Sequence, residues 1–175
     1  FRASAGTVPH LAPQRIGGWA TLGRSLYKGT WKSSTLSTKF FEATPDLATH
    51  LSYSDIEQFV ALLRTLSQKS WDLATECLAL GVELFPKLDV DGHAFIDLGT
   101  VLAERSWREV KGCFEGMPRL LTNVQKEHRG RFLRLAERQA RSGMTNVAAF
   151  LSHGSAALGR VDHANQGHLF DLAER

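Results

Sequence analysis

The stretch FVALLRTLSQKSW, residues 59–71, decides the fold, because it occurs in four aligned copies without a gap. The other copies are WATLGRSLYKGTW at 19–31, FIDLGTVLAERSW at 95–107 and FLRLAERQARSGM at 132–144. Each copy places an aromatic residue, a leucine and a mostly small residue at i, i+3 and i+4, and three copies add a second leucine at i+7. This spacing forms one face of an amphipathic helix and does not fit a strand, whose side chains alternate with period two.

A polar turn follows this first helix, and three of the turns end in a hydroxyl residue, Thr30, Ser70 and Ser106. A hydroxyl at this position can accept a hydrogen bond from the free amides that open a helix. We therefore expect a second helix to begin at the next residue. The residues at that position are Trp31, Trp71, Trp107 and, in the last copy, Met144. We expect this tryptophan column to be buried between neighbouring repeats.

A longer repeat period, which spans two hairpins, also supports an array of helical hairpins. FEATPDL at 41–47 recurs 73 residues later as FEGMPRL at 114–120, and Gly81 recurs as Gly154. Each second helix of the first three repeats carries one proline near its expected end, Pro45, Pro86 and Pro118. Because proline lacks the amide hydrogen that a helix needs, we expect each of them to end its helix.

The repeats predict an all-α protein, an α-solenoid of about four helical hairpins of the HEAT or armadillo kind with a period of about 36–40 residues. We expect a single array over residues 1–175 with repeats at about 13–53, 54–90, 91–126 and 127–163. FRAS at 1–4 matches FEAT at 41–44, and FDLAER at 170–175 matches the IDL and LAER segments of the third copy. We therefore expect the chain to be a fragment that begins and ends within a repeat.

Composition narrows the class of protein. The chain has 175 residues, 43% of them apolar and 22% charged, as in soluble globular proteins, and its net charge is only +3. No apolar run approaches the roughly 18–20 residues that cross a bilayer, so we expect no membrane contact. Cys77 and Cys113 have no Cys-x-x-Cys spacing and are expected to be buried free thiols, which favours the cytoplasm.

The candidate functional surface is basic. Arg131, Arg134, Arg138 and Arg141 follow one another at spacings of 3, 4 and 3, which places them on one helix face. Five further cations lie at the turns between paired helices: Lys28, Lys32, Lys69, Arg105 and Arg108. These nine residues could bind an acidic protein or a nucleic-acid backbone. The alternative is a solvated helix face, because glutamates are interspersed with the arginines.

Catalysis finds no support in the sequence. It contains no His-Glu-x-x-His metal motif, no phosphate-binding glycine loop and no Gly-x-Ser-x-Gly elbow, so we expect no metal and no cofactor. One alternative is an enzyme of the helical-repeat DNA-glycosylase type, which needs a carboxylate in a cleft beside exposed tryptophans. Asp72 next to Trp71 is the only pair of that sort. We expect a protein that is not an enzyme.

Three short sequence motifs resemble those of a known family: FRAS at 1–4, FFEATP at 40–45 and LAERSW at 102–107. They resemble the helical repeats that precede the von Willebrand factor A domain in bacterial activator proteins of the rubisco-activase and nitric-oxide-reductase-activation type. The resemblance implies an adaptor that works with a hexameric MoxR-type AAA+ ATPase to remodel a metalloenzyme or similar client. The family's metal-dependent adhesion motif, Asp-x-Ser-x-Ser, is absent from this chain, so no client-binding residue is carried over.

The sequence therefore predicts a non-catalytic, protein-binding helical-repeat scaffold, with the AAA+ ATPase or its client as the partner that the resemblance implies. A HEAT-like protein that binds nucleic acid through the basic residues is the alternative. Binding that weakens steeply as salt rises would favour nucleic acid.

Overall fold

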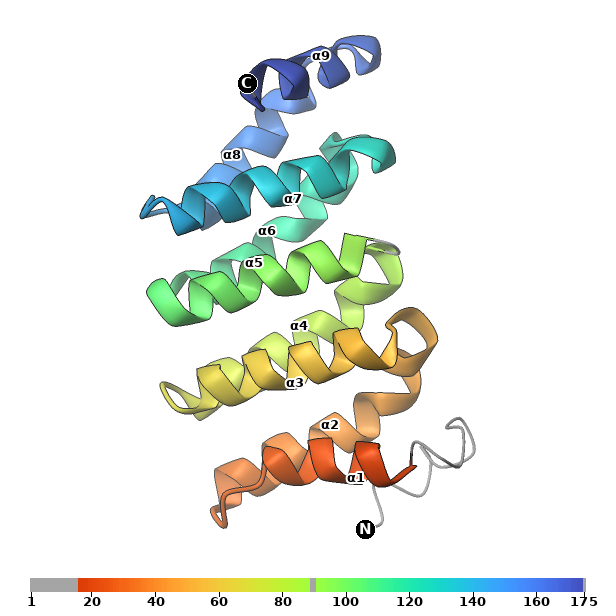
Figure 1. Ribbon diagram of the computed structural model, residues 1–175, viewed down its shortest axis with the longest axis vertical. Helices are drawn as coiled ribbons and strands as arrows, with labels where there is room; N and C mark the ends of the chain where they lie inside the picture. The colour runs from red at the N-terminus through yellow and green to blue at the C-terminus, as the bar shows by residue number, and fades with distance from the viewer. Residues whose placement is uncertain (1–15, 89–90, 175) are drawn as a thin grey trace. The chain divides into compact units, whose positions relative to one another are not determined.

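The computed structural model describes residues 16–88 and 91–174, and within these two ranges every regular element is an α-helix (Figure 1). The prediction of an all-α fold is confirmed. The chain divides into two compact units, Phe1–Asp89 and Val90–Arg175. We call them the N-terminal and the C-terminal unit and describe each by itself, so a solenoid that runs through both stays a prediction.

The N-terminal unit consists of two stacked helical hairpins. Its helices are α1 (Ile16–Ser25), α2 (Trp31–His50), α3 (Tyr53–Ser67) and α4 (Trp71–Leu88). Within each hairpin the two helices pack together, and α1 also packs on α3 while α2 packs on α4. First helices therefore stack on first helices and second helices on second helices, as Figure 1 shows for the red-to-yellow half of the chain.

The C-terminal unit follows the same scheme. Its helices are α5 (Gly92–Arg105), α6 (Glu109–Asn123), α7 (Lys126–Arg141), α8 (Val147–Leu158) and α9 (His163–Ala173). The hairpins α5/α6 and α7/α8 stack through α5 on α7 and α6 on α8, and α9 packs against α7 (Figure 1). The helical hairpin is thus the structural unit in both halves.

One aromatic pair marks the core of each hairpin. The aromatic residue that opens each first-helix stretch is buried in all four copies, Trp19, Phe59, Phe95 and Phe132. Each packs against a phenylalanine of the paired second helix, with ring centroids 4.6–6.4 Å apart: Trp19 with Phe40, Phe59 with Phe85, Phe95 with Phe114, and Phe132 with Phe150. Such pairs add to the stability that burial of apolar surface provides.

The 73-residue period is reproduced in the packing. A Cβ on Gly81 would lie 2.7 Å from the Phe59 ring, and a Cβ on Gly154 would lie 2.9 Å from the Phe132 ring. Phe59 and Gly81 recur as Phe132 and Gly154, each 73 residues later. At both places the glycine lets the ring of the first helix approach the backbone of the second.

The expectation that the prolines end their helices is wrong. Pro45, Pro86 and Pro118 all lie inside helices, and α2 and α6 continue to His50 and Asn123. Proline removes one amide from the helix but does not end it when the residues beyond it pack well. Leu47 and Leu120 lie beyond Pro45 and Pro118, are buried, and their carbonyl oxygens accept the last amide hydrogens, which come from Leu51 and Val124.

The second helices begin as predicted in the N-terminal unit only. The hydroxyl of Thr30 accepts a hydrogen bond from the Ser33 amide, the hydroxyl of Ser70 accepts one from the Leu73 amide, and α2 and α4 begin at the tryptophans. Ser106 instead donates its hydroxyl hydrogen to the Glu109 carboxylate, and α6 begins two residues after Trp107. In the fourth repeat α8 begins at Val147, three residues after Met144. The prediction of a cap at Ser106 and of a helix start at Trp107 is therefore wrong.

Candidate functional site

The nine cations of the predicted basic surface are all at least partly exposed, but three of them are engaged within the chain. Lys32 pairs with Asp72, Arg131 with Asp171 and Glu174, and Arg141 with Glu137. The other six form no ion pair with a described residue: Lys28, Lys69, Arg105, Arg108, Arg134 and Arg138. Lys28, Lys32 and Lys69 belong to the N-terminal unit and the arginines to the C-terminal unit.

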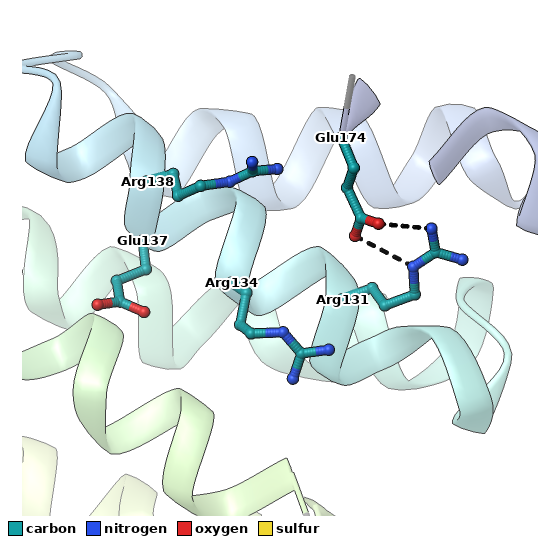
Figure 2. Close-up of a pocket in the computed structure, with 5 residues that line it drawn as sticks. All are labelled: Arg131, Arg134, Glu137, Arg138 and Glu174. Carbon is teal, nitrogen blue, oxygen red and sulfur yellow. Dashed lines mark hydrogen bonds and ion pairs between the residues drawn. The ribbon is translucent and has the colours of Figure 1, made fainter. Parts of the chain in front are cut away.

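Arginines of α7 and the end of α9 form the first groove, which we call the arginine groove. It has a volume of about 530 Å³ and is lined by Arg131, Arg134, Glu137, Arg138 and Glu174 (Figure 2). The Arg131 guanidinium donates two hydrogen bonds to the Glu174 carboxylate, at 3.1 and 2.7 Å, and one to Asp171 at 2.7 Å. It also lies 5.5 Å from the centre of the Phe170 ring.

The charges of the arginine groove act mainly on one another. The hydrogen bond from Arg131, followed by its charge and the charges of Arg138 and Arg134, lowers the pKa of Glu174 below its ordinary value of 4.5. The hydrogen bonds to Glu174 and Asp171 in turn raise the pKa of Arg131. Three arginines face two glutamates in the lining, Asp171 adds a third acid beside it, and Arg141, which pairs with Glu137, adds a fourth cation. The ion pairs of Arg131 hold α9 against α7.

The second groove lies between the start of α2 and the start of α4, and we call it the tryptophan groove. It has a volume of about 220 Å³ and is lined by Trp31, Lys32, Thr35, Trp71, Asp72, Thr75 and Glu76. Trp31 is 74% exposed, more than any other large apolar side chain that the structure describes. Trp71 is half-buried. Two neighbouring helices thus present an indole each at the same end.

An ion pair links the two helices across the tryptophan groove. The Lys32 ammonium lies 3.2 and 3.1 Å from the two carboxylate oxygens of Asp72, and 5.5 Å from the centre of the Trp31 ring. The Thr35 and Thr75 hydroxyls donate to the carbonyl oxygens of Trp31 and Trp71, both at 3.0 Å, so their hydrogens are used within the helices. The groove therefore combines two aromatic walls with an exposed charge pair.

The predicted burial of the tryptophan column is wrong for Trp31 and overstated for the others. Trp71 and Trp107 are half-buried, and Met144 is exposed. The core of α2 runs through Ser33, Leu36, Ser37, Phe40, Thr44 and Leu47. Trp31 precedes Ser33 by two residues, about 200° around the helix, and so points away from this stripe.

Trp107 has a different setting in the C-terminal unit. The Arg108 guanidinium lies 5.1 Å from the centre of its ring. Glu109, next along the chain, accepts hydrogen bonds from the amides of Asn146 and Ala148 at 3.0 and 3.4 Å, and so links α6 to the start of α8. A carboxylate at a helix N-terminus is favourable.

The described residues were also compared with the requirements of a metal site, a membrane-spanning helix and a DNA-glycosylase type of active site. No group of three or more metal-ligating side chains occurs among them, and none of their helices is both long and apolar enough to cross a membrane. Cys77 and Cys113 are buried free thiols, as predicted. The Asp72 side chain is 74% exposed and bound by Lys32, which is not the enclosed carboxylate that a DNA-glycosylase type of site needs.

Comparisons with protein-family models, curated proteins and solved structures gave no match to this chain.

Proposed function

We propose that the chain is a non-catalytic helical-repeat scaffold that binds another protein through the tryptophan groove. The observation that carries the proposal is the 74% exposure of Trp31 beside Trp71. An indole that stays in water forgoes the stabilisation of burial, and tryptophan is the residue most enriched where protein interfaces gain their binding energy. The Lys32–Asp72 pair supplies the polar rim that surrounds such anchors.

The size of the groove also supports a protein partner. Pockets for small ligands usually measure about 300–1,000 Å³ and enclose their ligand. The tryptophan groove, at about 220 Å³, is smaller than this and open along the two helices. It suits one or two side chains that project from a larger surface.

The arginine groove is the less favoured binding surface. Glu174 and Asp171 both pair with Arg131, and Glu137 pairs with Arg141, so these ion pairs already engage two of the four arginines of α7. Arg134 and Arg138 remain as the cations through which nucleic acid would bind in the alternative function. Two such cations would neutralise only about two phosphates and release few counterions, so the support for that alternative is weak.

Affinity capture tests the proposal. The tagged wild-type chain, the Trp31→Ala variant and the Arg134→Ala/Arg138→Ala variant are used as baits in nuclease-treated lysate of the source cells, followed by quantitative mass spectrometry. We expect one or more proteins to be captured by the wild type and by the double arginine variant, and about tenfold less by Trp31→Ala, as for a hot-spot residue.

Two results would contradict this expectation. Equal capture of the same proteins by Trp31→Ala would remove the tryptophan groove from the interface. Retention of nucleic acid without nuclease, lost in the double arginine variant and steeply weakened by salt, would support the nucleic-acid alternative.

A finer proposal is that the scaffold belongs to a larger adaptor that works with a MoxR-type AAA+ ATPase. This proposal is supported by the resemblance of the motifs FRAS, FFEATP and LAERSW to the helical repeats of the bacterial activator family. The sequence of the parent gene tests it: a von Willebrand factor A domain downstream of these repeats is expected, and its absence would count against the adaptor.

A further inference from the structure

We infer that the tryptophan groove binds a proline-rich segment of the partner protein, with two prolines three residues apart against the two indoles. The inference rests on the proposed function and adds the chemistry of the segment that enters the groove. Two features of the groove carry it: the spacing of its indoles, and the hydrogen-bond donors that its lining leaves unused.

The two indoles lie at equivalent places on two neighbouring helices. Trp31 is the first residue of α2 and Trp71 is the first residue of α4, and α2 packs directly on α4. Both indoles line the same groove. Because the axes of packed helices lie about 8–10 Å apart, we expect the two rings to be separated by about the same distance.

A polyproline II helix matches this spacing. It has three residues per turn and rises about 3.1 Å per residue, so side chains on one face recur about every 9 Å. On one face of a β-strand they recur about every 7 Å. An α-helix comes near the required distance only over two turns, at about 10.5 Å. Prolines at positions i and i+3 of an extended segment can therefore each contact one indole.

The indole N–H groups are the donors that the lining leaves unused. Neither the Trp31 nor the Trp71 indole donates a hydrogen bond to a described residue. The hydroxyl hydrogens of Thr35 and Thr75 are already bonded to carbonyl oxygens within their helices. A segment that suits this groove therefore brings apolar surface for the rings and hydrogen-bond acceptors for their N–H groups.

A proline-rich segment supplies both. A polyproline II helix has no internal hydrogen bonds, so all its carbonyl oxygens can accept, whereas an α-helix uses most of its carbonyl oxygens for its own backbone. Proline has no amide hydrogen and so adds no donor that would need a partner in the groove. Its ring packs on aromatic side chains in other grooves that bind proline-rich segments, and the extended segment loses little entropy on binding.

The ion pair of the groove favours an uncharged segment. The Lys32 ammonium lies 3.2 and 3.1 Å from the two carboxylate oxygens of Asp72, and this pair joins α2 to α4. A charged side chain in the groove would compete with one member of the pair. Proline leaves the pair intact, and the pair in turn holds the two helices, and with them the two indoles, at a fixed separation.

The test uses three capped, uncharged peptides and nuclear magnetic resonance of the indole N–H groups of the ¹⁵N-labelled full chain. The first peptide is decaproline. The other two are decapeptides of identical composition, four prolines and six serines. In one of them proline recurs at every third position. In the other the prolines alternate with serine and the remaining serines follow, so no two prolines are three residues apart. Trp→Phe variants assign the four tryptophan signals.

We expect decaproline and the peptide with proline at every third position to shift the signals of Trp31 and Trp71. The signals of Trp19 and Trp107, which do not line the groove, should stay in place. The alternating peptide should bind severalfold more weakly than its isomer, because only one of its prolines at a time can contact an indole.

Matched variants test the indole N–H groups. Trp71→Phe keeps an aromatic ring and removes the donor, so we expect it to weaken decaproline binding by about three- to tenfold, in line with the loss of one hydrogen bond. Trp31→Phe makes the same change at a mostly exposed position and should have a similar effect. Trp107→Phe is the control outside the groove and should bind decaproline as the wild type does.

Three results would overturn the inference: no shift of Trp31 and Trp71 with decaproline, equal binding of the two proline–serine peptides, or wild-type decaproline binding by both Trp31→Phe and Trp71→Phe. The proposed function is judged separately. A chain that captures a partner through Trp31 but fails these peptide tests keeps its protein-binding function and loses the proline-rich segment.

Discussion

The two units share the same packing of stacked helical hairpins, which we call the shared frame, and they differ in the grooves on their surfaces. In the N-terminal unit the ring of Trp31 lies 5.5 Å from a lysine ammonium and is 74% exposed. In the C-terminal unit the ring of Phe170 lies 5.5 Å from an arginine guanidinium and is 3% exposed. A cation on an aromatic ring therefore has two uses here. Around Phe170 it holds a helix in place, and around Trp31 it leaves the ring open to solvent.

This difference shows why exposure is more informative than charge in this protein. Arginines are readily placed at a surface whether or not they bind anything, and here Arg131 and Arg141 are paired with acids of the same chain. A tryptophan at the surface has a cost in unrealised burial, so its exposure calls for an explanation. The aromatic groove is therefore the better candidate interface.

Loss of the Phe170 ring should have the largest effect on stability. Phe170 is buried against His128 and Phe132, with ring centroids 5.4 and 6.1 Å apart, and under Arg131. We expect Phe170→Ala to lower the free energy of unfolding by about 3–5 kcal/mol, as other buried phenylalanines do. Urea unfolding followed by circular dichroism measures it. A change below about 1 kcal/mol would mean that α9 is not held as described.

The shared frame is tested by the glycines that lie against the buried rings. Gly81→Ala and Gly154→Ala should each destabilise the chain by about 1–3 kcal/mol, because the new methyl group would press on Phe59 or Phe132. Gly17→Ala is the control, since no atom of the described residues outside its own stretch of helix lies within 4 Å of a Cβ there, and should be neutral or stabilising by up to about 1 kcal/mol. Equal effects at all three positions in thermal melts would show that the 73-residue repeat of the packing is not real.

Much of this frame could be predicted from the sequence. The stripe that begins with Trp19, Phe59, Phe95 and Phe132 fixed the first helices, and the four aromatic residues are indeed buried. The periodicity of a stripe within one helix is local and therefore visible in a sequence.

The tryptophan groove could not be predicted in the same way. Whether Trp31 is buried depends on where it lies on α2 relative to the buried face of that helix and on what packs there, which a column of aligned residues does not reveal. The prolines misled for a similar reason, because α2 and α6 continue past Pro45 and Pro118 as long as the next leucines pack. The pairing of Arg131 depends on acids that follow it by some 40 residues, Asp171 of α9 and Glu174 directly after it.

The smallest expected effect concerns pH. Because Arg131 lowers the pKa of Glu174 below 4.5 in the folded chain, the pair contributes stability that is fully present above 4.5. This contribution is lost as the pH falls through the lower pKa of the folded state. Arg131→Gln should therefore lower the urea midpoint slightly at about pH 6, and the difference from wild type should shrink at about pH 3. A difference that grows on acidification would contradict the ion pair between α7 and α9.

The free energy of unfolding of Trp31→Ala, measured in urea beside the wild type, tests the central claim most directly. Because the ring is mostly in water, we expect a change within about 0.5 kcal/mol, as for a surface residue. A loss of about 3 kcal/mol or more would place Trp31 in the core and leave no aromatic wall for a partner to bind.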